Sequence, residues 1–279
     1  MGEHVLVVVP TFNGSCFIRE TIRSVQVQDH GNWTLVVADD RSTDDTRRIV
    51  ASAADEDRRI HLVRLETNSG GPATPRNRAI DFALRAKIPF EYIAFLDDDD
   101  IWMANKLTRQ LSLFRAYPEA GLVYSKRFFR LYGTRKTRVK RVEVRRLSGA
   151  LLFASIPTSS VVLRRVYVEP YFPLFDEDPL LRAVEDFELW IRLLAHGLIA
   201  RTCDEELFVY RVRAGSITER TIRGQLRRDR YLFSRIASKY PDVPKALVNV
   251  AMAGRMCKRT FDKLVFGPVR RLVGRVNED

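Results

Sequence analysis

The sequence has few cysteines and histidines and no long apolar run, although it is 279 residues long. Its three cysteines lie far apart without metal-type spacing, which argues against a disulfide framework or a zinc cluster and favours a reducing compartment. No apolar run approaches the ~18 residues of a membrane-spanning helix, and no basic, apolar leader precedes the first apolar stretch. We therefore expect a cytoplasmic protein that is soluble or peripheral, with the inner face of the membrane as the place for a peripheral one.

Basic residues outnumber acidic ones and give a formal net charge of +12, but they are concentrated in two segments. Residues 126–146 and residues 221–279 each carry nine more Lys and Arg than Asp and Glu. Such segments suit nucleic acid, anionic lipid head groups or an acidic substrate. For the first segment, the alternative is an exposed basic ribbon that only keeps the protein soluble.

Apolar, β-branched runs alternate with helical patterns through the first hundred residues. Each run has the length of a strand buried on both faces, and a polar cluster follows it. Strand, loop and helix repeated in this order predict βαβ units, so the fold class is α/β with a mostly parallel central sheet flanked by helices. Ligands of such sheets bind beyond the carboxyl ends of the strands, where the polar clusters lie. The four runs are Val5–Val9, Trp33–Ala38, Ile60–Leu65 and Tyr92–Leu96.

Four consecutive carboxylates, Asp97–Asp100, follow the last of these runs, and Ile101 and Trp102 come directly after them. We call these four residues the acidic tetrad. Carboxylates at the end of a buried strand need a positive partner, and their oxygen ligands favour Mg²⁺ or Mn²⁺ carrying the phosphates of a substrate. A solvated acidic turn is the alternative, but the apolar residues on both sides favour a site.

The chain contains four segments in order: Val8–Asn13, Asn32–Asp44, Asn68–Gly71 with Arg76–Ala79, and Ala94–Trp102 with Lys106 and Leu107. Together they resemble the nucleotide-binding half of the family 2 glycosyltransferases, which have the GT-A fold. The resemblance is close over residues 4–125 and looser over residues 148–218. It implies a GT-A, Rossmann-like sheet and an enzyme that transfers a sugar from a nucleotide diphospho-sugar, with a UDP-sugar as the expected donor. Arg41 and Pro75 depart from the family pattern without removing a functional group, and either could alter donor preference.

The resemblance also implies which residues bind the donor. Asp39 would accept a hydrogen bond from the base, Thr11 would contact the nucleoside, and Arg76 would lie against the base or the diphosphate. For the paired aspartates after the second strand, the alternative is helix capping together with Ser42. The full set of expected donor-binding residues is Pro10, Thr11, Asn13, Asp39, Asp40, Arg76, Asp97, Asp98 and Arg213, the last of them against the diphosphate.

A second acidic pair, Glu185 and Asp186, begins a predicted helix. It matches the Glu-Asp element of the family, which implies that Asp186 is the general base and that Glu185 is a supporting acid or an acceptor contact. The alternative for this pair is simple matching of acidic residues to the helix dipole. Within the acidic tetrad, the resemblance implies Asp99 as the direct metal ligand, Asp97 at the other outer position, and Mn²⁺ or Mg²⁺ as the cofactor. A single displacement would invert the anomeric configuration.

We predict a GT-A domain over residues 1–220, made of a nucleotide-sugar half, 1–125, and an acceptor half, 126–220. A basic amphipathic helical extension would follow over residues 221–279. Such helices suit an anionic membrane surface, the catalytic domain or a second subunit. The expected partners are a nucleotide-sugar donor and a glycan or lipid-linked acceptor in the assembly of a surface polysaccharide, with peripheral association to an anionic membrane as a further expectation.

Two other functions stay open from the sequence. A metal-dependent nucleotidyltransferase also uses carboxylates on a nucleotide-binding sheet, but it more often has a glycine-rich basic loop where this chain has Pro10–Asn13. A non-catalytic nucleic-acid-binding protein would account for the two basic segments. The carboxylates at the strand ends argue against phosphate-backbone binding there, so nucleic acid is not expected as a partner.

Overall fold

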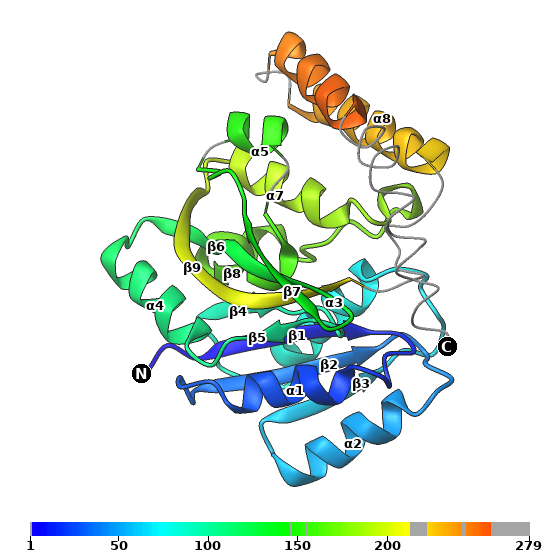
Figure 1. Ribbon diagram of the computed structural model, residues 1–279, viewed down its shortest axis with the longest axis vertical. Helices are drawn as coiled ribbons and strands as arrows, with labels where there is room; N and C mark the ends of the chain where they lie inside the picture. Colours follow the sequence, from blue (N-terminus) through cyan, green and yellow to red (C-terminus); the bar gives the residue numbers. More distant parts are fainter. Residues whose placement is uncertain (1, 146, 154–155, 213–221, 241–243, 258–279) are drawn as a thin grey trace.

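The computed structural model describes residues 2–145, 147–153, 156–212, 222–240 and 244–257 of the chain. Its centre is one sheet with the strand order β3-β2-β1-β4-β8-β6-β9-β5, and β7 pairs with β6 beside this path. Helices cover both faces of the sheet (Figure 1). The α/β fold class is confirmed, with a parallel first half and a second half that mixes parallel and antiparallel pairs.

The first four strands are parallel and closely match the runs predicted from the sequence. The register sets Thr11 beside Asp39 and Val8 beside Phe95, so the carboxyl ends of neighbouring strands lie at one edge of the sheet. The polar clusters that follow the strands are thereby brought together. The four strands are β1 (Val5–Thr11), β2 (Trp33–Asp39), β3 (Ile60–Arg64) and β4 (Tyr92–Phe95).

The alternation of side chains along β1 divides the interior into two apolar layers. Val5, Val7 and Val9 face the first layer, and Leu6 and Val8 face the second. Every residue of β1 and β2 is buried, which explains why these runs are apolar except for Thr34. The helices of the first layer are α1 (Ile18–Gln26), α2 (Thr46–Glu56) and α4 (Lys106–Ala116), and those of the second are α3 (Ala73–Arg85) and α7 (Glu185–Ala195).

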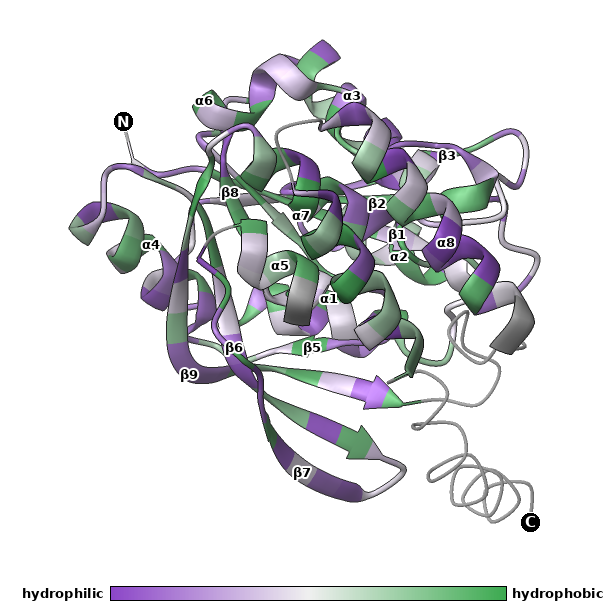
Figure 2. Ribbon diagram, turned by 90° about the horizontal axis from the view of Figure 1, so that it is seen from above, coloured by the Kyte–Doolittle hydropathy of each residue, from purple (hydrophilic) through white to green (hydrophobic). Residues whose placement is uncertain are grey.

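The second half of the sheet carries a long ribbon that projects from the helices (Figure 2). In it, β6 is parallel to β9 and antiparallel to β7. Much of the basic segment 126–146 forms the hairpin of β6 and β7, but β6 begins before the segment and β7 ends before Val144, which turns into the apolar core. We call residues 127–140 the basic arm. The three strands are β6 (Ala120–Tyr132), β7 (Arg135–Lys140) and β9 (Ile199–Val212).

Short elements join the two halves of the sheet. β8 (Val162–Arg164) lies between β4 and β6 and is antiparallel to both. β5 (Ile101–Trp102) follows the acidic tetrad directly and pairs with β9. The remaining elements are α5 (Leu147–Phe153), η1 (Thr158–Ser160), α6 (Arg165–Val168), η2 (Glu169–Tyr171) and η3 (Pro179–Leu181).

The described part of the C-terminal extension packs on the rest of the protein. α8 (Ile222–Lys239) buries Leu232, Phe233 and Ile236 in the same apolar layer as α7, and a further helical segment follows over residues 245–257. The apolar face of α8 therefore contacts the protein core, which is one of the three partners expected for it. No helix within the described ranges is long and apolar enough to cross a membrane.

The predicted division of the chain at residue 220 stays a prediction. Residues 213–221, which contain the proposed boundary, lie outside the described residues. The same holds for 241–243 and 258–279 of the predicted extension.

Candidate active site

The turn after β1 packs tightly against the acidic tetrad. The hydroxyl of Thr11 donates a hydrogen bond to Oδ2 of Asp98 at 2.7 Å. Gly14 lies against this pair, because a Cβ placed there would come within 2.5 Å of Oδ2 of Asp98 and 2.7 Å of the Thr11 hydroxyl. Pro10 is buried within β1, and the side chain of Asn13 accepts a hydrogen bond from the backbone of the loop after β2 at 2.8 Å. The residues predicted for donor binding here thus fix the shape of this edge.

Asp39, at the end of β2, is completely buried and already has partners. Its carboxylate accepts hydrogen bonds from the backbone N–H of Ser42 at 3.1 Å and from Nε of Arg47 at 2.5 Å. The side chain of Arg47 is 35% exposed. Because α2 begins only at Thr46, Asp39 does not cap this helix. The capping alternative is therefore wrong, although the bond to Ser42 exists.

Asp40 holds the loop that follows β3. Its carboxylate accepts hydrogen bonds from the backbone N–H of Ser69 at 2.8 Å and from the Ser69 hydroxyl at 2.9 Å, and its backbone carbonyl accepts one from the side chain of Asn68. Burial raises the pKa of Asp40, and the hydrogen bonds from Ser69 oppose this shift. In the structure, Asp40 anchors the loop, and its contact with a donor stays a prediction.

The acidic tetrad is divided into two inner and two outer carboxylates. Asp98 and Asp100 are buried, whereas Asp97 and Asp99 are partly exposed. Asp100 accepts hydrogen bonds from the hydroxyl of Ser159 at 2.6 Å and from a backbone N–H of β9 at 3.0 Å. Burial raises the pKa of Asp100 well above its usual value, and the charges of Asp99 and Asp97 add to the shift. The inner pair therefore holds loops together, and the outer pair borders the site.

Asp97 and Asp99 are suited to a hard divalent cation, because they offer carboxylate oxygens at the open edge of the sheet. Oδ1 of Asp97 accepts a hydrogen bond from Arg76, and the side chain of Asp97 is 35% exposed. Among the described residues, no three His, Cys, Asp or Glu side chains gather into a metal site. The donor set thus fits Mg²⁺ or Mn²⁺ only if phosphate oxygens of a substrate complete the coordination.

Arg76 joins the acidic tetrad to the start of α7. It lies in the first turn of α3, is 3% exposed, and donates to Oδ1 of Asp97 at 2.7 Å and to Oε1 of Glu185 at 3.1 Å. Its guanidinium carbon lies 4.9 Å from the ring centroid of Phe175. Burial alone would lower the pKa of Arg76, but the negative charges of Asp97, Glu185 and Asp186 outweigh it and the pKa is raised. This charge is thus neutralised within the protein.

The acidic pair at the start of α7 contains two different carboxyl groups. Burial raises the pKa of Glu185 to about 7, the charge of Asp186 adds to the shift, and Arg76 opposes it. Asp186 is partly exposed, and its two oxygens accept hydrogen bonds from the hydroxyl of Thr158 at 2.8 Å and from the backbone N–H of Phe187 at 2.7 Å. Asp186 is thus held in place at the surface of the site, while Glu185 lies behind it.

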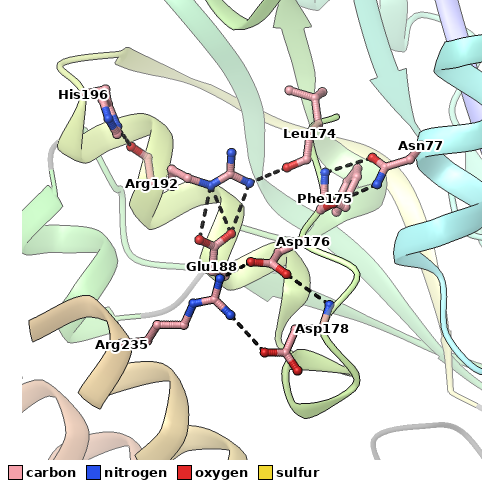
Figure 3. Close-up of polar contacts among 9 residues, drawn as sticks. All are labelled: Asn77, Leu174, Phe175, Asp176, Asp178, Glu188, Arg192, His196 and Arg235. Carbon is pink, nitrogen blue, oxygen red and sulfur yellow. Dashed lines mark hydrogen bonds and ion pairs between the residues drawn. The ribbon is translucent and has the colours of Figure 1, made fainter. Parts of the chain in front are cut away.

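The segment 174–178 supports this arrangement, and sequence reasoning missed it. The side chain of Asn77 makes two hydrogen bonds to the backbone of Phe175, at 2.8 Å and 2.9 Å (Figure 3). Arg192 of α7 donates to a backbone carbonyl of the segment, and Arg235 of α8 pairs with two of its carboxylates. The segment therefore connects α3, α7 and α8 directly beneath Arg76.

Two more residues of the site had no role assigned from the sequence. Thr158 and Ser159 in η1 bind Asp186 and Asp100, respectively. Their only signal is a short polar run after Pro157, between apolar segments. Of the residues that were predicted, Arg213 lies outside the described residues. The others gather around the carboxyl ends of β1, β2 and β4 and the start of α7.

Loops of a nucleotide-binding type on one side of Arg76, and the acidic start of α7 on the other, are the architecture of a GT-A enzyme. The chain belongs to glycosyl transferase family 2, because the family model matches residues 6–167. It is therefore an enzyme, a glycosyltransferase. This membership decides against the nucleotidyltransferase and against the non-catalytic nucleic-acid-binding protein.

Relatives of known name support the same family. The chain is 32% identical over 218 residues to the putative teichuronic acid biosynthesis glycosyltransferase TuaG of Bacillus subtilis, a match that covers 77% of this chain and 81% of the relative. It is 29% identical over 238 residues to WfaP of Escherichia coli, named a UDP-Glc:alpha-D-GlcNAc-diphosphoundecaprenol beta-1,3-glucosyltransferase, with 83% and 86% covered. WfgD of Escherichia coli bears the same enzyme name and is 31% identical, with 77% and 79% covered.

Solved structures share the fold. The structure of S. aureus TarS 1–349 in complex with UDP-GlcNAc matches with a TM-score of 0.71 and 20% identity, over 95% of this chain and 75% of that chain. The mannosyltransferase PcManGT from Pyrobaculum calidifontis, in complex with GDP-Man and Mn²⁺, matches with a TM-score of 0.62 and 20% identity, over 98% and 73%. At this identity the likeness establishes the GT-A architecture of the chain.

Proposed function

We propose that this glycosyltransferase moves a sugar from a UDP-sugar to a hydroxyl of a lipid-linked diphospho-sugar, with inversion, in the assembly of a surface polysaccharide. The observation that carries the proposal is the position of Arg76, which bonds to Asp97 of the donor side and to Glu185 beside the predicted base. Arg76 thereby joins the residues expected to bind the donor to the residue expected to activate the acceptor, at one edge of the sheet. The names of WfaP and WfgD support the donor and acceptor classes.

Asp186 is the general base of the proposed reaction. An acceptor hydroxyl is a poor nucleophile, and Asp186 takes its proton while the oxygen attacks the anomeric carbon. The hydrogen bonds from Thr158 and from the backbone of Phe187 fix the orientation of this carboxylate. Because the attack comes from the face opposite the leaving diphosphate, one displacement inverts the configuration and no covalent intermediate forms on the enzyme.

The outer carboxylates of the acidic tetrad serve the donor. Asp99, with Asp97, would hold Mn²⁺ or Mg²⁺ together with the donor diphosphate, and the bound ion would neutralise negative charge on the leaving group. Arg76 holds Asp97 in position for this task. The carboxylate of Asp39 accepts a hydrogen bond from the imide N–H of the uracil base, and this bond replaces the one from Arg47. Asp40 keeps the loop after β3 closed over this side.

A lipid-linked acceptor also requires contact with a membrane surface. Leu232, Phe233 and Ile236 of α8 are buried in the protein, so we assign this contact to the charged residues of β7 in the basic arm, which are exposed. The chain should float with anionic vesicles at low salt and be released at high salt. Equal binding to neutral vesicles, or none to anionic ones, would contradict this part of the proposal.

Thermal denaturation with nucleotides tests the donor assignment without knowledge of the sugar. Binding to the folded state raises the melting temperature, so UDP with Mn²⁺ should raise it more than GDP, CDP or dTDP with Mn²⁺. The variant Asp99→Ala should lose the part of the shift that depends on the metal. Asp81→Asn, an exposed carboxylate of α3, is the matched control and should retain it. A shift that is equal for all nucleotides would argue against recognition of uracil.

The base assignment is tested by turnover. Asp186→Asn should retain the UDP-dependent shift and lose about 10²- to 10⁴-fold in the rate of sugar transfer, because the proton acceptor is removed while the donor side is intact. Transfer from radiolabelled UDP-glucose to a synthetic GlcNAc-diphospho-lipid is the measurement. A loss of less than tenfold would mean that another group takes the proton.

A further inference from the structure

Arg130 of β6 lies on the face of the projecting ribbon that packs against the first apolar layer, which also contains Trp102. In the register of the parallel pair β6 and β9, Arg130 is the partner of Tyr210. Alternate residues of a strand share a face, so Arg130 shares its face with Phe128, whose ring centroid lies 4.9 Å from Phe208 and 6.3 Å from Tyr210. These aromatic contacts place Arg130 and Tyr210 on the inner face of the ribbon.

The same face reaches the acidic tetrad. β9 pairs with β5, so that Phe208 lies beside Trp102, and the backbone of Arg211 donates to Asp100 at 3.0 Å. Burial raises the pKa of Tyr210, the carboxylates of the tetrad raise it further, and Arg130 lowers it. Tyr210 is therefore close enough to interact electrostatically with both the tetrad and the guanidinium of Arg130.

Two hydrogen-bonded contacts connect this face to the predicted base. Nε1 of Trp102 donates to the carbonyl of Ser159 at 2.8 Å, and the next residue toward the N-terminus, Thr158, donates to Asp186. Trp102, Tyr210 and Arg130 thus follow one another outward from η1 along the ribbon. The residues predicted to bind the nucleoside, Thr11 and Asp39, lie instead at the ends of β1 and β2, so we place the acceptor on the side of Trp102 and Tyr210.

Arg130 has no acidic partner in the part of the chain that the structure describes. Its Nη1 donates a hydrogen bond to the hydroxyl of Tyr132 at 3.2 Å, and its Nε is buried without a hydrogen bond among the described residues. Within the same described part, the hydroxyl of Tyr210 makes no hydrogen bond. By contrast Arg127, on the opposite face of the same strand, pairs with Asp204 at 2.7 Å. A half-buried guanidinium with only a neutral partner favours an anionic ligand.

We infer that Arg130, with the hydroxyls of Tyr132 and Tyr210, binds the diphosphate of the lipid-linked acceptor. The inference rests on the proposed function, and it names the group on the protein that recognises the acceptor. In a diphospho-linked acceptor, the diphosphate lies one sugar ring away from the reacting hydroxyl. It needs a cation beyond Asp186, and Arg76 cannot serve because its charge is held by two carboxylates. A guanidinium can bind two phosphate oxygens at once, which fixes the orientation of the acceptor sugar.

Binding of geranyl diphosphate, which carries the anionic group and a short isoprenoid but no sugar, tests the inference. The titration is done on the full chain with saturating UDP and Mg²⁺, so that the donor side is occupied. Arg130→Gln should weaken binding at least about tenfold, since a charge-assisted hydrogen bond is lost. Arg130→Lys should recover part of this loss, because lysine restores the positive charge but not the paired N–H donors of the guanidinium. Tyr210→Phe should weaken binding by a smaller factor.

Arg127→Gln is the matched control, because it removes an arginine of the same strand on the opposite face. It should bind geranyl diphosphate as the unaltered chain does. An equal loss in Arg127→Gln and Arg130→Gln would reduce the effect to general charge and overturn the inference. Unchanged binding in Arg130→Gln would overturn it as well.

The shift in melting temperature caused by UDP separates this inference from the proposed function. It should be the same in Arg130→Gln and in the unaltered chain. If the variant loses the UDP shift, Arg130 serves the donor and the assignment to the acceptor is wrong. If the unaltered chain shows no UDP shift but binds geranyl diphosphate through Arg130, the acceptor site stands and the donor proposal fails.

Discussion

Arg76 and Arg130 lie on the two sides of the same site, and they differ in what surrounds their charge. Arg76 is 3% exposed and bonds to Asp97 and Glu185, whereas Arg130 bonds only to a tyrosine hydroxyl among the described residues. A cation that is buried between carboxylates is already paired in the folded chain, and its removal leaves those two acidic groups without a positive partner. A cation beside neutral groups can instead pair with an anionic ligand. We therefore expect the first to matter for stability and the second for binding.

Replacement of Arg76 gives the largest expected effect on stability. Arg76→Met should lower the free energy of unfolding by about 3–5 kcal/mol, the usual range when one partner of a buried ion pair is removed. Urea unfolding near neutral pH is the measurement. Arg130→Met, the same substitution on the other side of the site, should cost less than about 1 kcal/mol. Similar losses in both variants would break the comparison between the two arginines.

Replacement of Glu185 gives the next effect, and it depends on pH. The folded-state pKa of Glu185 is raised from 4.5 to about 7. Between these two pH values, Glu185 keeps its proton in the folded chain and releases it in the unfolded chain. The stability contributed by the protonated form is complete below pH 4.5 and is lost as the pH rises through about 7. Across this window the unaltered chain should lose about 2–3 kcal/mol relative to Glu185→Gln.

The comparison of these two chains, rather than either alone, is essential. Asp100 also has a raised pKa and would produce the same sign of pH dependence in both of them. Urea unfolding at several pH values between 4.5 and 7.5, without nucleotide or metal, gives the difference. Parallel pH profiles for the two chains would show that the pKa of Glu185 is the same in the folded and the unfolded protein.

Arg235 provides an intermediate case, with an expected effect smaller than those of Arg76 and Glu185. It pairs with Asp176 and Asp178, but all three side chains are 22–25% exposed (Figure 3). Arg235→Gln should lower the free energy of unfolding by about 1 kcal/mol, since solvent screens the pair. Arg85→Gln, which removes an exposed pair on α3, should change it by less than about 0.5 kcal/mol. A loss in Arg235→Gln as large as that in Arg76→Met would mean that α8 is essential to the fold.

The sequence predicted the donor side of the fold well, because its signals are local. Apolar β-branched runs such as Val5–Val9 fix both the strand and its burial on two faces, and parallel strands bring their carboxyl ends to one edge. It could not tell which carboxylates of the acidic tetrad turn inward. That choice is made by Thr11 and Ser159, which are 87 and 59 residues away from the aspartates that they bind.

The acceptor side was predicted less completely, because its contacts are long-range. Arg76 and Glu185 are 109 residues apart, and no pattern in the sequence joins them. The segment 174–178 contains ordinary acidic and apolar residues, and only the packed structure shows that it supports three helices. In the basic arm, a count of charges treats all arginines alike. The structure separates Arg127, which has an acidic partner, from Arg130, which has none among the described residues.

The pairing of Asp39 with Arg47 makes nucleotide recognition an exchange of partners. On the proposed assignment, the uracil base must displace a guanidinium that already occupies the carboxylate at 2.5 Å. The affinity gained is then the difference between the bond of Asp39 to uracil and its bond to Arg47. Binding of the nucleotide is weaker as a result, and UDP is released more readily after transfer. A base without an imide N–H offers no replacement bond, and the arginine keeps its place. The contact between Arg47 and Asp39 thereby weakens the binding of every nucleotide and also increases the selectivity among nucleotides.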